Sequence, residues 1–324
     1  MYKILNISNY DGDLKKFEYN HSNMIKFQEK YNLDGFEILQ FNQWKEEQIP
    51  RDIIKGLHLR FYPTWIDFYR GDIDKLLSKI ELEENVSMLY GGDHKKVIID
   101  YYKSELRTAK EMGVEYVVFH VCHVDLNEAL TYEFAYSDEE IIHESANLIN
   151  EIFSGEEEYK FTLLLENLWW PGLKLNNKEN MRNIIHKINY DKVGFMLDTG
   201  HMINTNLDIK DKDEAIEYII ETIDGLDEMK NYIKGIHLNY SLSGDYVKQF
   251  IESQRKIKRK YEFKELFKNI YDHISKIDYH DPFEHTRVND LIESLDIKYL
   301  VYELLAPILE ELEDKIKRQD KWIK

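Results

Sequence analysis

The stretch Val193-Gly-Phe-Met-Leu-Asp198-Thr-Gly-His201 decides how the rest of the chain is interpreted. An apolar run of five residues bounded by polar turn residues predicts a buried parallel strand. In α/β proteins, the polar side chains that follow the C-terminal end of such a strand are the ones that carry chemistry. We therefore expect Asp198 and His201 to face a functional site.

Four further apolar runs end in the same way, in an acid or a histidine. They lie at residues 117–120, 162–166, 236–237 and 299–303, and they end at His120, Glu166, His237 and Glu303. One such strand would be a coincidence in a partly polar core, but five in one chain indicate a common rim at one end of a sheet.

The composition is typical of a globular protein with a large core, since 43% of the 324 residues are hydrophobic. The chain has 43 Lys and Arg against 61 Asp and Glu, which gives a formal charge of −18. Binding to a phosphate backbone is favoured by clustered cations. This balance predicts a small-molecule substrate, polar or singly charged, and no nucleic-acid partner.

The compartment is predicted from the N-terminus and from the cysteine content. Residues 1–7 lack the basic and long apolar regions of a secretory signal, and no stretch approaches the roughly 18 apolar residues of a membrane span. The single cysteine, Cys122, excludes an intrachain disulfide and agrees with a reducing compartment. We predict a cytoplasmic protein without a membrane partner, in which Cys122 is buried and inert rather than a nucleophile.

Eight strand patterns alternate with helical patterns, at residues 2–7, 35–41, 56–61, 114–120, 161–166, 193–198, 234–238 and 297–303. Eight strands joined by helices, without antiparallel hairpins, predict an α/β fold, a closed (β/α)8 TIM barrel in one domain over residues 1–324. The alternative is a doubly wound open sheet. That fold normally shows a glycine-rich phosphate loop after its first strand, and Asn-Tyr-Asp-Gly at residues 9–12 is not one.

Two long connections, residues 62–93 and 244–282, interrupt this alternation. The first contains Gly71, Gly91 and Gly92 and is predicted to be an irregular, elaborated loop. The second carries a basic run, residues 254–260, which is predicted to be a solvated helix face. Both follow strand ends on the side where loops carry function, so we expect them to cover the barrel mouth. An amphipathic helix over residues 307–324 is expected to close the chain.

Glu166, Asp198, His237 and Glu303 end four consecutive strands, so barrel closure brings them around one half of the mouth. Three carboxylates held that close repel one another unless a cation lies between them. Mixed oxygen and imidazole ligands suit Mn²⁺, Mg²⁺, Co²⁺ or Zn²⁺, and the sequence does not rank these divalent metal ions. The alternative is that the four are separate polar rim residues with local partners.

The motifs Leu-Glu166-Asn, Leu-Asp198-Thr-Gly-His, His237-Leu-Asn and Tyr-Glu303, in this order, resemble the xylose isomerase-like TIM barrel superfamily. It includes sugar isomerases, ketose 3-epimerases, inosose dehydratases and endonuclease IV. The resemblance covers most of the chain and is strongest over residues 114–304. It implies a divalent-metal-dependent sugar or polyol isomerase or epimerase of carbohydrate metabolism. In such an enzyme the four residues bind one ion, and Glu166 and Glu303 exchange a proton with the substrate through an enediolate.

Further residues match the endonuclease IV side of the superfamily, namely His58, His120, His201, Asp278 and His280. They imply an alternative function, a zinc phosphoesterase with a multinuclear metal site. His58, His120 and His201 either bind a metal ion directly or, as an equal alternative, hydrogen bond to substrate or support other ligands. The family's usual separation from Glu303 leads to His273 rather than His280, so both histidines stay open as the one that faces the site.

Three residues near the strand ends are candidates for binding substrate. Trp169 and Trp170 follow the Glu166 strand, and an indole face there could stack on a sugar ring, although adjacent side chains point apart. Arg60 could bind a phosphate or a carboxylate. No glycine-rich phosphate loop follows the last two strands, which favours an unphosphorylated substrate. The substrate, the metal, the choice between one and three ions and the oligomeric state stay open.

Overall fold

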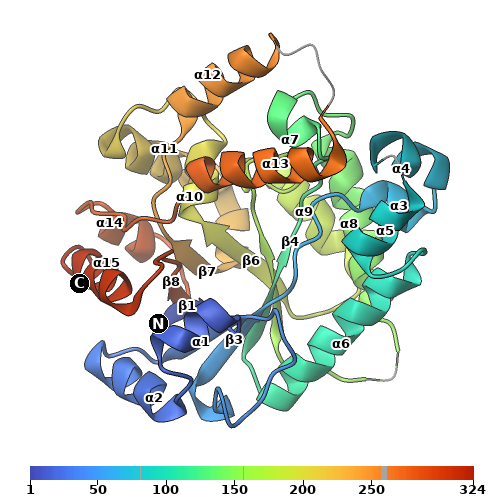
Figure 1. The fold of residues 1–324 in the computed structure, drawn as a ribbon. Helices are drawn as coiled ribbons and strands as arrows, with labels where there is room; N and C mark the ends of the chain where they lie inside the picture. Colours follow the sequence, from blue (N-terminus) through green and yellow to red (C-terminus); the bar gives the residue numbers. More distant parts are fainter. Residues whose placement is uncertain (81, 156, 257–260) are drawn as a thin grey trace.

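The structure is a computed structural model that describes residues 1–80, 82–155, 157–256 and 261–324, and its core is a closed barrel (Figure 1). Each strand pairs in parallel with the next one in the chain, and β8 closes the barrel against β1. This confirms the predicted (β/α)8 TIM barrel. The strands are β1 (Tyr2–Ser8), β2 (Gly35–Leu39), β3 (Ile54–His58), β4 (Tyr116–His120), β5 (Thr162–Glu166), β6 (Val193–Asp198), β7 (Ile233–Leu238) and β8 (Tyr299–Tyr302).

Helices connect the strands and surround the barrel. None of those in the described ranges is both long and apolar enough to cross a membrane. They are α1 (Asp11–Lys16), α2 (His21–Lys30), η1 (Arg51–Ile53), α3 (Ile66–Arg70), α4 (Ile73–Ile80), α5 (Glu83–Tyr90), α6 (Lys96–Met112), α7 (Glu128–Thr131), α8 (Asp138–Ile152), α9 (Lys178–Lys187), α10 (Thr199–Asn204), α11 (Lys212–Asp224), η2 (Asp227–Tyr232), α12 (Gly244–Gln254), α13 (Phe263–Ile277), α14 (Val288–Glu293) and α15 (Leu309–Asp320).

Apolar side chains form two cores. The larger one lies between the strands and the helices, and the smaller one fills the inside of the barrel with Ile4, Tyr116, Val118, Leu164, Met196, Tyr299 and Val301. The rings of Tyr116 and Tyr299 lie 4.2 Å apart across the interior. Gly56 makes this possible, because a Cβ at that position would overlap the Tyr116 ring. The barrel interior is therefore a packed core in its lower part.

The period of two residues along each strand explains where the polar residues lie. Val118, Leu164 and Met196 point into the barrel, so the residues two positions later also point inward, one layer closer to the C-terminal ends. That next layer contains His120, Glu166 and Asp198, and Glu303 follows Val301 in the same way. The same alternation that builds the apolar core therefore places a polar layer directly above it.

The first insertion is helical, and the prediction of an irregular loop at residues 62–93 is wrong. It contains α3, α4 and α5. Gly71 and Gly91, which suggested irregularity, are the C-caps of α3 and α5, with φ of 75° and 80°. Glycine adopts this left-handed conformation at low cost, so here it ends helices rather than preventing them.

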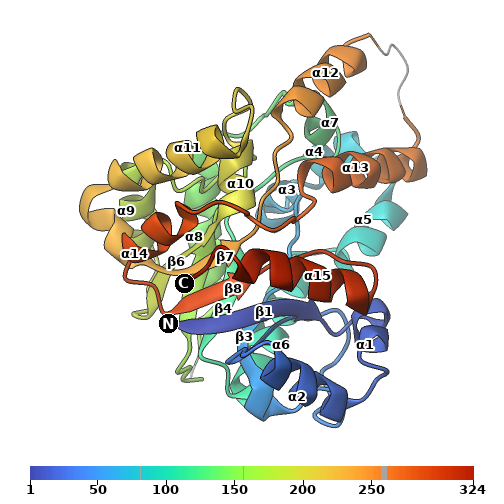
Figure 2. The ribbon, with the colours of Figure 1, turned by 90° about the vertical axis from the view of Figure 1, so that its left-hand side faces the viewer.

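The second insertion contains α12 and α13 (Figure 2). Figure 2 shows both helices on the side of the barrel where the strands end, beside α7. Residues 257–260, which hold most of the predicted basic helix face, lie outside the described residues. The chain returns from α13 to the barrel through residues 278–282, and Tyr240 and Asp281 pair there across an isolated antiparallel bridge. This return segment brings Asp278 and His280 to the polar layer.

Candidate metal centre

Asp198 shows how the local fold positions this site. It ends β6 and is also the N-cap of α10, since its Oδ1 accepts a hydrogen bond from the backbone N–H of His201 at 2.6 Å. Its Oδ2 accepts a hydrogen bond from the side-chain amide of Asn239 at 2.7 Å. Any side chain at Gly200 would overlap Asn239. Strand end, helix cap and close packing thus account for the Asp-Thr-Gly-His sequence.

Glu166 lies at the centre of the polar layer, fully buried and in contact with four histidines. Its Oε2 lies 3.0 Å from Nε2 of His58 and 3.1 Å from Nε2 of His120. Its Oε1 lies 3.1 Å from Nδ1 of His237 and 3.4 Å from Nδ1 of His201. A single carboxylate therefore joins two pairs of imidazoles, as a ligand shared between neighbouring ions does.

His237 is held between carboxylates on both of its nitrogens. Nε2 lies 3.0 and 3.1 Å from the two oxygens of Glu37, a buried carboxylate on β2 that also accepts a hydrogen bond from Asn6. Nδ1 lies 3.1 Å from Glu166 and 3.1 Å from Oε2 of Glu303. A neutral ring that donates from Nε2 to Glu37 presents a lone pair at Nδ1, directed at two anionic carboxylates. Such an arrangement requires a cation between them, either a proton or a metal ion.

His58 and His201 repeat this pattern. Nδ1 of His58 lies 3.0 Å from the carbonyl oxygen of Leu59, and Nδ1 of His201 lies 2.8 Å from that of Asn167. A carbonyl oxygen only accepts, so each Nδ1 carries the hydrogen, and each Nε2 is left to face a carboxylate. For His201 this partner is Asp278, at 3.2 Å. Metal-binding histidines are typically held in this way, with the second nitrogen donating to a fixed acceptor.

Asp278 and His280 complete the polar layer from the return segment after α13. Oδ1 of Asp278 lies 2.8 Å from Nε2 of His280. The His280 backbone has a positive φ of 48°, and its N–H donates a hydrogen bond to the Ser241 hydroxyl at 3.0 Å. A left-handed backbone at a non-glycine residue costs free energy, so the surrounding contacts hold His280 in this position. His273, the other candidate, stacks on Phe250 at 3.7 Å and belongs to the packing of the second insertion.

Eight of these side chains form sets whose ligand atoms lie within 4.8 Å of one another. The sets are His58, His120 and Glu166; His58, His237 and Glu303; Glu166, Asp198, His237 and Glu303; and Asp198, His201 and His280, with Asp278 beside the last as a ninth candidate ligand. Several atoms are buried without a hydrogen bond in the described part of the chain, including Glu303 Oε2, Asp278 Oδ1 and both ring nitrogens of His280. Asp278 Oδ1 and His280 Nε2 still lie 2.8 Å apart, and Glu303 Oε2 lies 3.1 Å from His237 Nδ1, so these donor atoms are crowded together without well-formed hydrogen bonds. Donor atoms crowded in this way fit divalent metal ions. The residues therefore suit a centre of up to three ions.

The protonation of the cluster without metal follows from these contacts. Burial opposes the charged form of His58, but the hydrogen bond to Glu166 and the charges of Glu166 and Glu37 outweigh it and raise the pKa to about 9. Burial opposes the charge of His280 too, and the neighbouring Asp278 and Glu303 raise its pKa to about 9. For Asp198, burial is the main cause of a pKa raised to about 8. Without metal, protons thus occupy the places where cations fit.

The remaining predicted residues lie at different depths. Trp170 is 2% exposed and packs in the core, whereas the Trp169 ring lies 5.2 Å from that of His201 and is the member of the pair next to the centre. Cys122 is fully buried, and burial raises the pKa of its thiol well above the usual value. A thiol in such surroundings stays protonated and makes a poor nucleophile.

A further group of potential ligands lies apart from the centre, beneath the first insertion. It consists of His123, Asp125 and Glu128. Nδ1 of His123 accepts the backbone N–H of Trp65 at 3.2 Å, so Nε2 carries the hydrogen and faces Oδ1 of Asp125 at 3.3 Å. Lys79 forms an ion pair with the same aspartate. Ion pairs with Lys79 and His123 neutralise Asp125 and link the insertion to the barrel, although His123 Nε2 and both Asp125 oxygens have no well-formed hydrogen bond in the described part of the chain.

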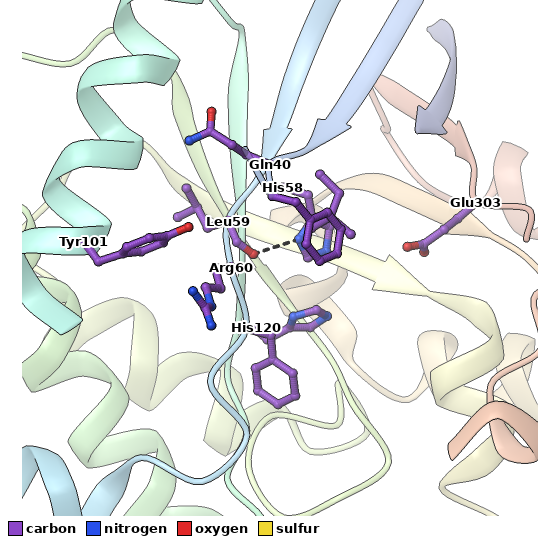
Figure 3. A pocket seen from close by; sticks show the side chains of 10 residues that line it. Gln40, His58, Leu59, Arg60, Tyr101, His120 and Glu303 are labelled. Carbon is purple, nitrogen blue, oxygen red and sulfur yellow. Dashed lines mark hydrogen bonds between the residues drawn. The ribbon is translucent and has the colours of Figure 1, made fainter. Parts of the chain in front are cut away.

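A cavity of about 440 Å³ opens onto the candidate metal centre (Figure 3). His58, His120 and Glu303 border it on the side of the centre, and the segments after β2 and β3 form the opposite wall. The full lining is Leu39, Gln40, Phe41, His58, Leu59, Arg60, Phe61, Tyr101, His120 and Glu303. Its volume suits a small molecule.

Glu37 is a part of the site that the sequence argument missed. Its signal is a carboxylate at an inward position of the predicted strand 35–41, where an uncompensated charge is costly. We expect Glu37→Gln to weaken metal binding about 10- to 100-fold, because the His237 ring loses the anionic partner that fixes its orientation. Competition with a chromogenic chelator measures this. Glu115→Gln, which alters an ion pair with Lys298 just before β4, is the control, and equal affinities in the two variants would contradict the role.

Comparisons with known proteins agree with this fold. The family model described as xylose isomerase-like TIM barrel matches residues 29–297. Over 186 residues the chain is 29% identical to a probable endonuclease 4 of Metamycoplasma arthritidis, covering 54% of this chain and 60% of that protein. Over 104 residues it is 31% identical to an inosose isomerase of Bacillus subtilis, covering 32% of this chain and 34% of that protein. Both matches span less than two thirds of the relative.

Among solved structures, endonuclease IV of Thermus thermophilus has the same fold, with a TM-score of 0.54, 12% identity and coverage of 99% of this chain and 98% of that one. At this identity the likeness concerns the fold alone. The family match covers most of the chain and includes eight of the nine candidate ligands, all except Glu303. The chain therefore belongs to the xylose isomerase-like TIM barrel family.

Proposed function

We propose that this protein is a metal-dependent phosphoester hydrolase that uses a centre of three divalent ions. The observation that carries the proposal is the grouping of nine buried or nearly buried ligand side chains in four overlapping sets, with Glu166 common to two of them. Several ions close together act as a clamp that stabilises both the attacking and the leaving oxygen of a phosphoryl displacement. Zinc is the metal that the five histidines favour.

The number of ligands argues for this reaction over a one-ion proton transfer. A single ion among Glu166, Asp198, His237 and Glu303 would leave five polar side chains buried around it without a function. Removing such groups from water is costly unless a partner compensates. His58 and His120 face Glu166, which the single-ion site would already use as a ligand. His201 faces Asp278, which lies beside that site. Two further ions give these groups a role.

The residues of the chain have separable tasks in this proposal. When bound, divalent ions polarise a phosphoryl oxygen and acidify a water molecule. Glu166 is fully buried and serves to position the histidines around it. Glu303 borders the cavity with 14% of its side chain exposed. Burial opposes the charge of its carboxyl, but the neighbouring His237 and His280 outweigh burial and hold the pKa below the usual value. It is the ionised acceptor that can hold and orient a water or a substrate hydroxyl.

A second candidate is the sugar or polyol isomerase or epimerase. It is favoured by the position of Glu166 and Glu303, which both lie 3.1 Å from the same nitrogen of His237 and so flank one point. Two carboxylates around one substrate carbon can remove and return a proton. The inosose isomerase relative supports a small polyol as the substrate.

Metal counting and two assays distinguish these candidates. Elemental analysis of the purified protein is expected to find three ions per chain, and the loaded protein is expected to hydrolyse bis(p-nitrophenyl) phosphate. In a parallel assay, candidate ketoses are incubated in deuterated water, and the exchange of their C–H protons is followed by NMR. One ion per chain, together with C–H exchange and no hydrolysis, would replace the phosphoesterase by the isomerase.

A further inference from the structure

The cavity beside the candidate metal centre has a second wall, and the residues that form it belong to none of the metal-ligand sets. Figure 3 shows Arg60 and Tyr101 on one side of His58 and His120, with Glu303 on the other. A substrate that reaches the centre through this cavity has a reacting part near Glu303 and His120. Its non-reacting part then lies against the wall formed by Arg60, Tyr101 and Gln40.

Arg60 presents a cation without a carboxylate partner. Its guanidinium lies 4.8 Å from the ring centre of Tyr62 and 5.3 Å from that of Tyr101. It forms no ion pair with any acid in the described ranges. Glu105 accepts the backbone N–H of Arg60 at 3.1 Å but forms no ion pair with its guanidinium, and burial raises the pKa of this carboxyl to about 8. A guanidinium held by aromatic rings and free of counter-charge is suited to bind an anion.

Gln40 supplies a second, independent observation. Its side-chain carbonyl oxygen is buried and has no hydrogen-bond partner in the part of the chain that the structure describes. A buried polar atom of this kind is costly unless something else completes its hydrogen bonding. Gln40 lines the cavity with other atoms of its side chain, so a ligand there reaches this oxygen once the amide rotates toward it.

Two phenylalanines give the same wall flat apolar surfaces. The Phe61 ring lies 4.7 Å from that of His120, and Phe41, which is 60% exposed, borders the cavity from the segment after β2. Aromatic faces bind flat rings by stacking. The wall thus combines a cation, an unpaired amide oxygen and two aromatic rings within one small cavity.

We infer that this wall binds the non-reacting part of the substrate, a flat ring that carries a second anionic group. Arg60 binds that group, a carboxylate or a phosphate, while Gln40 hydrogen bonds to the polar edge of the ring and Phe61 stacks on its face. The inference rests on the proposed function in one respect, since it places the reacting phosphate ester at the metal ligands. It makes the substrate a small aryl or nucleotide-like ester with two anionic groups rather than a long nucleic acid, which agrees with the net charge of −18.

The test compares three probes by isothermal titration calorimetry on the metal-loaded protein. Phenyl phosphate lacks the second anion, 4-carboxyphenyl phosphate carries a carboxylate, and the 1,4-bisphosphate of hydroquinone carries a phosphate. The parent protein is expected to bind at least one of the two probes with a second anionic group about 10- to 100-fold more tightly than phenyl phosphate, as hydrogen bonds to charged groups predict. The tighter of the two identifies the anion. Arg60→Gln is expected to remove this preference and leave the affinity for phenyl phosphate within about threefold.

Arg107→Gln is the matched control, since Arg107 lies on α6 like Tyr101 but is half exposed and pairs weakly with Glu157, outside every ligand set. It should keep the preference. Two results would overturn the inference: a preference unchanged in Arg60→Gln, or a short DNA duplex that binds more tightly than all three probes. Hydrolysis is measured in parallel. A preference for the second anionic group that depends on Arg60, without hydrolysis, upholds the anion site and rejects the phosphoesterase. Hydrolysis without that preference upholds the phosphoesterase and rejects the anion site.

Discussion

Glu166→Gln is expected to lower turnover of a model phosphodiester by about two to three decades. The glutamine keeps the shape of the side chain but removes the charge that faces His58, His120, His201 and His237. Two ligand sets share this carboxylate, so metal content should fall at more than one position. Initial rates and elemental analysis of the same preparations measure both effects.

The same substitution at an exposed glutamate is the control for this experiment. Glu179 lies on α9 with 62% of its side chain exposed, and Glu179→Gln should leave rate and metal content unchanged. A rate for Glu166→Gln within threefold of that control would show that the shared carboxylate is not needed. Far-UV circular dichroism of both variants verifies that the barrel is folded.

Asp198→Ala is expected to weaken metal binding by more than about 100-fold. Loss of a residue that only hydrogen bonds to a metal ligand already costs about 10- to 100-fold in affinity, and Asp198 is proposed to be a ligand itself. Asp198 also caps α10, so the alanine variant should lose roughly 1 kcal/mol of unfolding free energy in the metal-free protein. Asp198→Asn retains a capping oxygen and should lose metal affinity with a smaller loss of stability. Chelator competition and urea unfolding separate the two roles.

Asp281→Ala is the control for this pair of variants. Its carboxylate is 42% exposed and forms an ion pair with Lys315 at 2.8 Å, away from the ligand sets. Surface pairs of this kind contribute little to stability, and metal binding should be unchanged. Equal metal affinity in Asp198→Ala and Asp281→Ala would contradict the assignment of Asp198 to the centre.

The choice between His273 and His280 shows why sequence spacing left both histidines open. Counting back from Glu303 leads to His273, but this residue lies on α13, where it packs on Phe250 and bonds to the Tyr246 hydroxyl. Loops tolerate insertions and deletions, so the number of residues between the second insertion and β8 is not constrained. Spacing from Glu303 alone therefore does not identify the residue that reaches the barrel. The return segment, not the helix, carries His280 to the centre.

Glu37 shows a different limit. Its position on an inward face was readable from the sequence, but its partner His237 is distant along the chain and lies across the barrel from it. The prediction named the four strand-end residues as one metal site, and the structure brings them within 4.8 Å of one another. It left the role of the other histidines open, and only their three-dimensional arrangement separates them into sets.

The sequence by itself determined the barrel and its polar layer, because both depend on local patterns. The order of strands and helices, the period of two residues within each strand and the polar residue after each apolar run are all visible without tertiary contacts. Only the tertiary structure decided which polar residues share a ligand set and that Glu37 holds His237. It also decided that Arg60 lies beside the centre without an ion pair among the described residues. These depend on barrel closure, which brings together residues far apart in the chain, and no local pattern records that distance.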